Sequence, residues 1–376
     1  MKLERRNISR RNRKSICGTD KDYQGHEAPL HPFLYMDLHE IFGEKMQFNV
    51  IMGNPPYQMQ DGGGTGKSAV PLYNRFVDKS KEYKPDLLIF VIPARWYAGG
   101  RGLDSFRSNM LSDPKISLLV DYPRSETVFS RVTIAGGVCF FLHDQQYKGD
   151  CFVIPDGDQT KATHRKLNEY DVFIRDEMDV QILRKVQRKV NENGWKPMSE
   201  VVSPRNFFGI QAHRLPSSIF HNSTSACETL LVTKDGDKYV HAIDIAKNSE
   251  TLHLWKVIVS KASAGTGGVL NKSGIRVVIT KPRVIGPQSI CTETYLLIDM
   301  FSSREPAERL LEYVKSRFFR FLLSLKTPTH NLSQKCFEFV PALPMDRIWN
   351  DEILYDFFDL TDQEIAHIES KIKVIN

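Results

Sequence analysis

Residues 47–57 read QFNVIMGNPPY, an apolar run that ends abruptly in a rigid turn. The apolar part has the pattern of a buried strand. Gly53-Asn54-Pro55-Pro56 closes it with residue types that interrupt regular structure. We therefore expect a strand here, followed directly by a turn that presents Asn54 and Tyr57.

The segments after this turn alternate between helix and strand patterns. Residues 70–83 carry apolar residues at helical spacing. Residues 86–93 (DLLIFVIP) are almost continuously apolar, which suits a central parallel strand covered on both faces. A helix at 106–111 and strands at 116–122, 132–142 and 150–155 are expected next. This rhythm predicts an α/β fold with a partial Rossmann-like, doubly wound sheet that ends in a hairpin at its edge.

The second half of the chain has a mixed α/β pattern. A helix is expected at 177–190 as a link between the two halves. Strands are expected at 256–260, 276–279 and 294–298, and helices at 305–325 and 362–373.

Composition narrows the class of protein. With 376 residues, 41% of them hydrophobic, the chain predicts a globular protein of two domains. Its apolar runs are too short for a membrane span, so no membrane partner is expected. The six cysteines are scattered and the histidines lack ligand spacing, which predicts no metal site, no disulfide framework and a cytoplasmic location. The net charge of +6 permits a polyanion partner.

The turn carries groups that suit a planar ligand with an exocyclic amine. The amine would donate its hydrogens to the Asn54 side-chain oxygen and the Pro55 carbonyl, while the ring stacks on Tyr57. An adenine flipped out of a DNA duplex is such a ligand. Proximity would then do most of the work, without a metal or covalent nucleophile. The alternative is that Asn-Pro-Pro-Tyr is only a rigid turn.

This motif resembles the catalytic motif of amino-methylating DNA methyltransferases, and residues 47–153 are similar to the combined restriction–modification adenine methylases of type II systems. Further segments that are similar to this family, over roughly residues 30–376, are SAVPLYNRFV (68–77), LLIFVIPARWYAGGRGLDSFR (87–107), LLVDYPRSETVF (118–129), VTIAGGVCFFL (132–142), SKASAGTGG (260–268), THNLSQKCFEFVP (329–341) and DLTDQEIAHIESKI (359–372).

The resemblance implies methyl transfer from S-adenosylmethionine to the exocyclic amine of a flipped adenine in double-stranded DNA. Its catalytic residues would be Asn54, Pro55, Pro56 and Tyr57. Phe129 occupies the position of a pocket residue that sandwiches the base, and a core aromatic is the alternative.

The implied organisation has four parts. Residues 1–30 are a basic flexible tail, 31–155 the catalytic half of a methyltransferase domain, 156–194 a linker helix and 195–376 a DNA target-recognition domain. DNA contacts are expected from Lys67, in the glycine-rich segment 62–68, and from Lys261 and Ser263. Solvated loops are the alternative at all three positions.

The donor-binding half of the family is not recognisable in this chain. Only 53 residues precede Asn54, and they hold no Phe-x-Gly-x-Gly loop after a strand. Asp37 is the one candidate for the acidic residue near the donor's adenine, with a surface carboxylate as the alternative. Three explanations stay open: a partner polypeptide supplies the donor-binding half or a nuclease, the chain is a truncated relative with weak activity, or the chain only binds DNA.

Two other function classes stay open at this point. The chain could be a catalytically inactive DNA-binding or specificity subunit that needs a partner. A phosphate-loop ATPase is disfavoured because Asp61 stands where the motif before Lys67 requires glycine.

Overall fold

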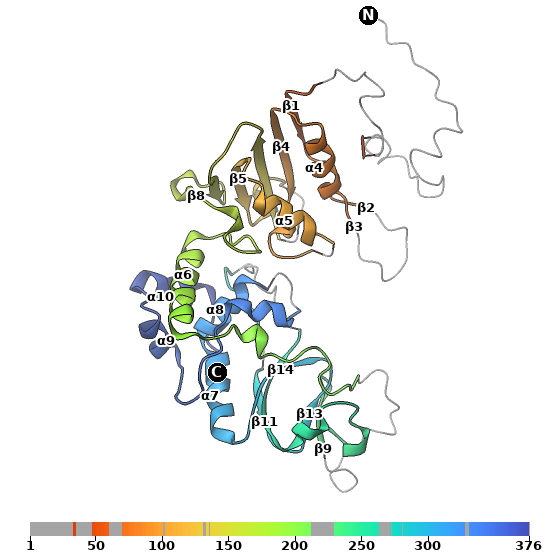
Figure 1. The fold of residues 1–376 in the computed structure, drawn as a ribbon, viewed down its shortest axis with the longest axis vertical. Helices are drawn as coiled ribbons and strands as arrows, with labels where there is room; N and C mark the ends of the chain where they lie inside the picture. The colour runs from red at the N-terminus through yellow and green to blue at the C-terminus, as the bar shows by residue number, and fades with distance from the viewer. Residues whose placement is uncertain are drawn as a thin grey trace, which may run out of the picture. The chain divides into compact units, whose positions relative to one another are not determined.

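The computed structural model describes residues 33–34, 47–59, 70–100, 102–130, 133–134, 136–211, 229–262, 271, 273–279, 281–327 and 331–375. The expected tail 1–30 lies outside these residues. The chain divides into two compact units, unit 1 ending at Arg175 and unit 2 beginning at Asp176, so the division falls inside the stretch expected to be a linker (Figure 1).

Unit 1 is built on a six-stranded mixed sheet with the strand order β1-β4-β6-β5-β7-β8. The strands are β1 (Val50–Gly53), β4 (Leu87–Pro93), β6 (Val138–Asp144), β5 (Ile116–Tyr122), β7 (Cys151–Pro155) and β8 (Thr163–Arg165). Two short strands, β2 (Gln58–Met59) and β3 (Val70–Pro71), form a separate ribbon. The helices are α4 (Tyr73–Glu82) and α5 (Asp104–Ser112).

Strands β1, β4, β5 and β7 run in one direction, whereas β6 and β8 run in the other. Helices α4 and α5 each lie in the chain between two of the parallel strands. The α/β fold and its partial Rossmann-like character are therefore confirmed. All four parallel strands have their carboxyl ends at the same edge of the sheet, which is where such folds place ligands.

The sequence predicted a terminal hairpin of the strands at 132–142 and 150–155, and this prediction is wrong. Strand β6 does not pair with β7 but lies between β4 and β5, antiparallel to both. In this position the backbone of β6 is paired on both edges, and Val138, Cys139 and Phe141 are fully buried in the middle of the sheet. The hairpin at the sheet edge is β7–β8 instead.

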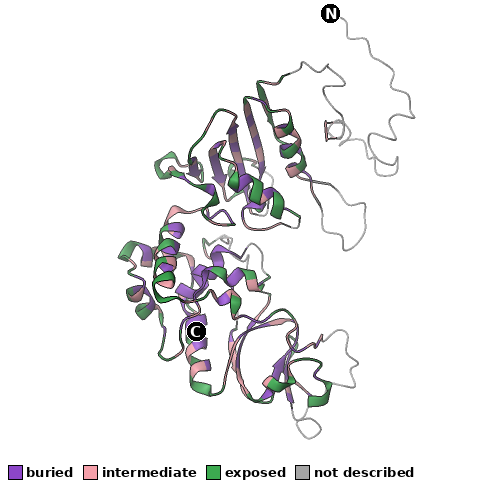
Figure 2. Ribbon diagram, viewed as in Figure 1, coloured by how far each residue is buried: buried purple, intermediate pink, exposed green. Residues whose placement is uncertain are grey.

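The two faces of this sheet are covered to very different extents (Figure 2). One face packs with side chains of α4 and α5 into a core that includes Leu88, Phe90, Ile92, Leu119, Cys139, Phe141 and Val153. On the other face the described residues leave Val50 and Met52 48% and 70% exposed. The same face carries half-buried apolar residues at Leu87, Ile89, Val91, Leu118, Phe140, Leu142 and Phe152. The sequence predicted that residues 86–93 form a strand covered on both faces. Within the described part of the chain, only one face of this strand is covered.

Unit 2 contains two three-stranded sheets and a set of helices. The sheets have the orders β10-β9-β13 and β12-β11-β14. Their strands are β9 (Thr229–Val232), β10 (Lys238–Val240), β11 (Trp255–Ser260), β12 (Arg283–Ile285), β13 (Ser289–Cys291) and β14 (Tyr295–Phe301). The helices are α6 (Glu177–Asn193), α7 (Arg304–Lys315), α8 (Arg317–Leu325), α9 (Asp351–Phe357) and α10 (Asp362–Lys371). One core joins both sheets through Leu231, Ile258, Ile290 and Leu297.

Two expectations for unit 2 are corrected. The helix expected at 305–325 breaks at Ser316, whose ψ of 149° is extended. Ser316 caps a new helix at this point, because its hydroxyl accepts the Phe319 N–H at 3.0 Å. The carboxylate of Asp351 accepts the backbone N–H groups of Arg317 and Phe318, each at 3.0 Å, and adds to this cap. Residues 276–279 form no strand, because Arg276 donates its backbone N–H to the Lys371 carbonyl instead.

Within the described residues, no helix combines the length and the apolar character that crossing a membrane requires.

Candidate active site

The Asn-Pro-Pro-Tyr turn lies at the carboxyl end of β1, at the ligand-binding edge of the unit 1 sheet. Gly53 ends the strand beside Phe90 of β4, and a Cβ atom at this position would come within 3.0 Å of the Phe90 ring. Glycine therefore allows the turn to leave the sheet without displacing that ring. Pro55 is buried and anchors the turn, while Asn54 is exposed and its side chain has a polar contact with Tyr57.

Tyr57 connects the turn to the core. Its ring packs against the buried cluster of unit 1, and its carbonyl accepts the Leu72 N–H at 3.2 Å. The hydroxyl is buried without a hydrogen-bond partner among the described residues. Burial raises the pKa of Tyr57 to about 12, although a longer polar contact with the Asn54 side chain opposes this. The phenol is therefore neutral at physiological pH.

Two further residues share this edge of the sheet. Arg95 lies in the short helical turn η2 (Ala94–Tyr97) directly after β4, and its side chain is exposed. Phe129 follows β5 and the turn η3 (Ser125–Thr127), with its backbone N–H bonded to the Ser125 carbonyl at 2.7 Å. The Phe129 ring is half-buried, so it is not a fully buried core aromatic.

Behind the turn lies a buried polar layer that the sequence did not indicate. Its centre is Cys139 of β6, whose thiol is fully buried and whose pKa burial raises to about 12. Polar interactions connect this thiol with Tyr57, Tyr73 and Tyr97. Burial raises the pKa of all three phenols and also that of the Asp121 carboxyl group, where the Arg175 charge opposes the rise.

Asp121 is paired with Arg175, the last residue of unit 1. The carboxyl group is 1% exposed, and Arg175 Nη1 lies 3.0 Å from Oδ1. The same guanidinium donates to the Gly136 carbonyl and lies over the Tyr97 ring, 4.9 Å from its centroid. An aspartate inside the apolar strand 116–122 was a visible sequence signal, whereas nothing in the sequence pointed to Arg175 as its partner.

Of the four remaining residues predicted for the site, only Lys261 lies in the described part of the chain. Asp37, Lys67 and Ser263 lie outside the described residues. Lys261 is half-buried at the end of β11, in unit 2. Its backbone N–H bonds to the Thr294 carbonyl at 2.8 Å, and its carbonyl accepts the Leu332 N–H at 2.8 Å.

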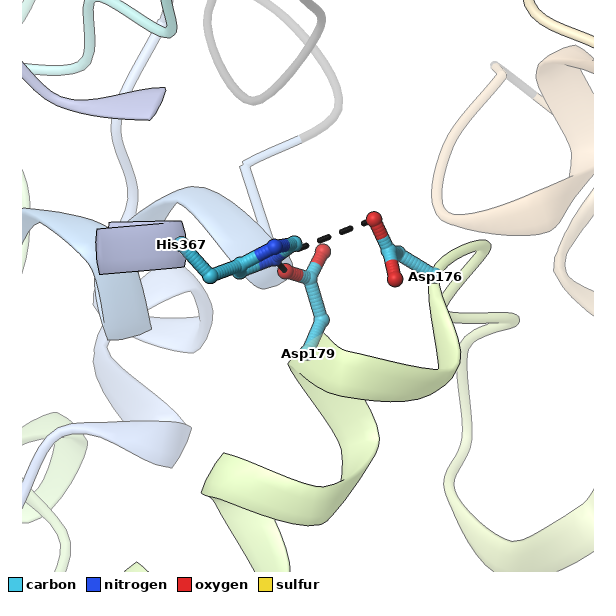
Figure 3. A group of neighbouring side chains, drawn as sticks. All are labelled: Asp176, Asp179 and His367. Carbon is cyan, nitrogen blue, oxygen red and sulfur yellow. Dashed lines mark hydrogen bonds and ion pairs between the residues drawn. The ribbon is translucent and has the colours of Figure 1, made fainter. Parts of the chain in front are cut away.

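One group in unit 2 has the composition of a metal site: Asp176, Asp179 and His367 (Figure 3). His367 Nε2 lies 2.7 Å from Asp179 Oδ1. Both carboxylates already have cationic partners, since Arg276 Nη2 is 2.6 Å from Asp179 and Lys371 Nζ is 3.1 Å from Asp176. This arrangement neutralises the charge that a metal ion would need, so we assign it as an ion-pair network linking α6, α10 and residue 276.

The four parallel strands, with the Asn-Pro-Pro-Tyr turn at their carboxyl edge, define an α/β fold whose candidate site is this turn. Residues 3–129 match the family described as Eco57I restriction-modification methylase. This match confirms the resemblance to adenine-specific methylases of restriction–modification systems, over about a third of the chain.

One curated relative supports the same assignment. An "Uncharacterized adenine-specific methylase" from Mycoplasma pneumoniae (strain ATCC 29342 / M129 / Subtype 1) is 28% identical over 152 residues. The match covers 37% of this chain and 36% of the relative, so the chain spans about a third of that protein.

Solved structures give weaker likenesses. The type IIG restriction endonuclease BpuSI is 11% identical with a TM-score of 0.34, over 85% of this chain and 49% of that protein. The type IIL restriction-modification enzyme MmeI, solved in complex with DNA, is 12% identical with a TM-score of 0.41, over 81% of this chain and 47% of that protein. The fold assignment rests on the strand order itself.

Proposed function

We propose that this chain carries the adenine-binding half of a site-specific DNA adenine methyltransferase from a restriction–modification system. The observation that supports this most is the exposed Asn54 side chain on a turn anchored by the buried Pro55 and the core-packed Tyr57. A rigid turn that presents an amide to solvent is suited to bind an extruded base. A purely structural turn would have no need of a solvent-facing amide at the ligand-binding edge.

The proposed chemistry uses hydrogen bonding rather than acid–base catalysis. The adenine amine donates one hydrogen to the Asn54 side-chain oxygen and one to the Pro55 carbonyl, while Tyr57 stacks on the ring. Two acceptors orient the nitrogen lone pair toward the methyl carbon. The C–N bond would form as the C–S bond of the donor breaks, S-adenosylhomocysteine would leave, and the amine proton would pass to solvent. A neutral Tyr57 phenol, with a pKa of about 12, avoids placing a negative charge beside the base. Phe129, half-buried at the same edge, would contact the other face of the base.

S-adenosylmethionine, when bound, supplies the electrophilic methyl group. The described residues fit the part of the site that binds the methyl acceptor, because Asn54 and Tyr57 hold and orient a base. They offer no anchor for the adenosyl group of the donor. Asp37 is proposed as a donor-side contact.

A second polypeptide is proposed to supply the rest of the donor site. The outer edge of β1 has no strand partner among the described residues, and the sheet face beside it exposes Met52 by 70% and Val50 by 48%. Apolar sheet faces of α/β proteins are normally covered on both sides. An added strand with its helices would cover this face and bring a donor-binding loop beside Asn54.

Reconstitution tests the proposal. The chain is mixed with the product of the neighbouring gene that encodes a Phe-x-Gly-x-Gly segment, and N6-methyladenine formation is measured with labelled S-adenosylmethionine and DNA of diverse sequence. Methylation that Asn54→Ala abolishes supports the function. DNA binding without any methylation would assign the chain as a catalytically inactive specificity subunit.

A further inference from the structure

The second unit contains a place where four chain segments that are distant in sequence meet at the start of β14. Ser203 donates its backbone N–H to Leu297 at 2.9 Å, and Glu293 donates to Ile210 at 3.2 Å, so residues 203–210 run along the edge of β14 that β11 leaves free. On the other edge, Lys261 donates to Thr294 at 2.8 Å, and Ser260 pairs with Tyr295.

The fourth segment comes from near the C-terminus. Leu332 donates its N–H to the Lys261 carbonyl at 2.8 Å, and Ala262 forms an isolated bridge with Asn331. Two of the segments that resemble the target-recognition region, 260–268 and 329–341, are therefore neighbours where they are described. Their separation of about 70 residues in sequence gave no indication of this.

Two cationic side chains flank the start of β14, where the four segments meet. Arg205 is exposed on the 203–210 segment, and Lys261 is half-buried at the end of β11. Neither forms an ion pair with a carboxylate of the described residues. The pKa of Lys261 lies below its usual range, first because of burial and second because of the nearby Arg205, while Glu293 opposes this to a smaller degree. The two positive charges thus repel each other without full compensation.

Arg205 is held on a fixed loop. The next residue, Asn206, has a φ of 60°, in the left-handed region, and its carbonyl accepts the Gly209 N–H at 3.0 Å to close a turn. Asn248 Nδ2 donates to the Phe207 carbonyl at 2.7 Å and ties the turn to the core. The backbone that carries Arg205 therefore loses little additional freedom when a ligand binds.

We infer that Arg205 and Lys261 together form a DNA phosphate contact of unit 2, placed at the start of β14. This inference rests on the proposed function, because a DNA substrate decides that the anion is a backbone phosphate. A phosphate between the two side chains would relieve their repulsion and bind through charge-assisted hydrogen bonds. Arg205 was not among the residues expected from the sequence, since it stands alone in SPRNFF without a basic neighbour.

Equilibrium binding of a short fluorescent DNA duplex to the full chain tests the inference. Anisotropy is measured over a salt series for wild type, Arg205→Ala, Lys261→Ala and the double variant. Because the two side chains share one phosphate, the double variant should lower the magnitude of the slope of log K against log salt by about one, and each single variant by no more than that. Arg205→Lys should retain most of the affinity because the charge is kept.

Lys196→Ala is the matched control, since Lys196 is 74% exposed and pairs with Glu200 on the same unit. It should leave the slope unchanged, and circular dichroism checks that every variant is folded. A double variant that binds DNA with the wild-type slope would overturn this inference and leave the proposed function standing. Wild-type protein that binds no DNA at low salt would overturn both.

Discussion

Arg175 Nη1 lies 3.0 Å from Oδ1 of Asp121 and donates a hydrogen bond of 3.1 Å to Oδ2, which ties the end of unit 1 to the ligand-binding edge of its sheet. The aspartate is 1% exposed, whereas the Arg175 side chain is 27% exposed. A carboxylate at this depth is tolerated only with its counter-charge, because burying an unpaired charge is costly. The pair also holds the Gly136 backbone, which precedes β6.

Replacing Arg175 should therefore destabilise unit 1 strongly. We expect Arg175→Ala to lower the free energy of unfolding by about 3–5 kcal/mol, because it leaves Asp121 buried and unpaired. The double variant Asp121→Asn with Arg175→Ala should recover part of this loss. Arg304→Ala, which removes an exposed pair with Glu308, should cost less than about 1 kcal/mol. Urea unfolding of the three variants measures this, and equal losses for both arginines would contradict the assignment.

Asn54→Ala should remove methyl transfer without unfolding the protein. The Asn54 side chain is exposed, so its loss should change the melting temperature little. Loss of one of two acceptors for the amine should reduce the rate by about 10²–10³-fold, as for the loss of a preorganised hydrogen bond in other active sites. Initial rates in the reconstituted enzyme measure this. Asn109→Ala, at an exposed position of α5, is the matched control and should keep full activity.

Tyr57 should respond differently to two substitutions. Tyr57→Phe keeps the stacking ring and removes a buried hydroxyl that has no partner among the described residues, so it should retain activity and gain up to about 1 kcal/mol of stability. Tyr57→Ala should lose both activity and packing. If the phenylalanine variant loses as much activity as the alanine variant, the stacking role assigned to the ring is wrong.

The same hydroxyl gives a pH prediction. The pKa of Tyr57 is raised from 10.0 to about 12, so its contribution to stability is complete below pH 10 and is lost as the pH rises toward 12. Thermal melts between these pH values should fall less steeply for Tyr57→Phe than for wild type. Parallel curves would show that the hydroxyl is not buried.

The Asp176–Asp179–His367 group should behave as an ion-pair network. Burial raises the pKa of Asp179, but Arg276, His367 and Lys371 outweigh it and hold this pKa well below 3.8. A lowered carboxyl pKa means that the stabilisation is present above about pH 4 and is lost as the pH falls further. Asp179→Asn should therefore be less stable than wild type at pH 7 and should lose less stability on acidification.

Adding zinc distinguishes an ion-pair network from a metal site at Asp176, Asp179 and His367. Zinc should not raise the melting temperature, because Arg276 and Lys371 already neutralise both carboxylates. A zinc-dependent increase that disappears in His367→Ala would show that the residues bind metal after all.

Local patterns in the sequence were sufficient for most of unit 1. The continuous apolar runs at 86–93 and 116–122 became β4 and β5, and the glycine and prolines after 47–52 ended β1 where expected. These features depend on neighbours in sequence, which is why periodicity reveals them. The same holds for the Asn-Pro-Pro-Tyr turn, whose chemistry is contained in consecutive residues.

Contacts between segments that are distant in sequence could not be predicted from local patterns. Periodicity does not distinguish an edge strand from an inserted one, so the position of β6 between β4 and β5 was missed. The apolar pattern of 305–325 continues through the break at Ser316, and the only local sign was the serine itself, which caps the second helix. The second contribution to this cap, the carboxylate of Asp351, lies 35 residues further on and could not be predicted from local patterns.

The sequence by itself determined the strand–turn motif with Asn54 and Tyr57, the α/β class and the expected chemistry, because these follow from residues adjacent in the chain. Only the tertiary structure decided which charges meet. It paired Asp121 with Arg175 across 54 residues, enclosed Arg276 with Asp179, and brought the segments that carry Arg205 and Lys261 to the two edges of β14. The physical reason is that burial and distance set the strength of an electrostatic interaction, and both arise only when distant segments pack together.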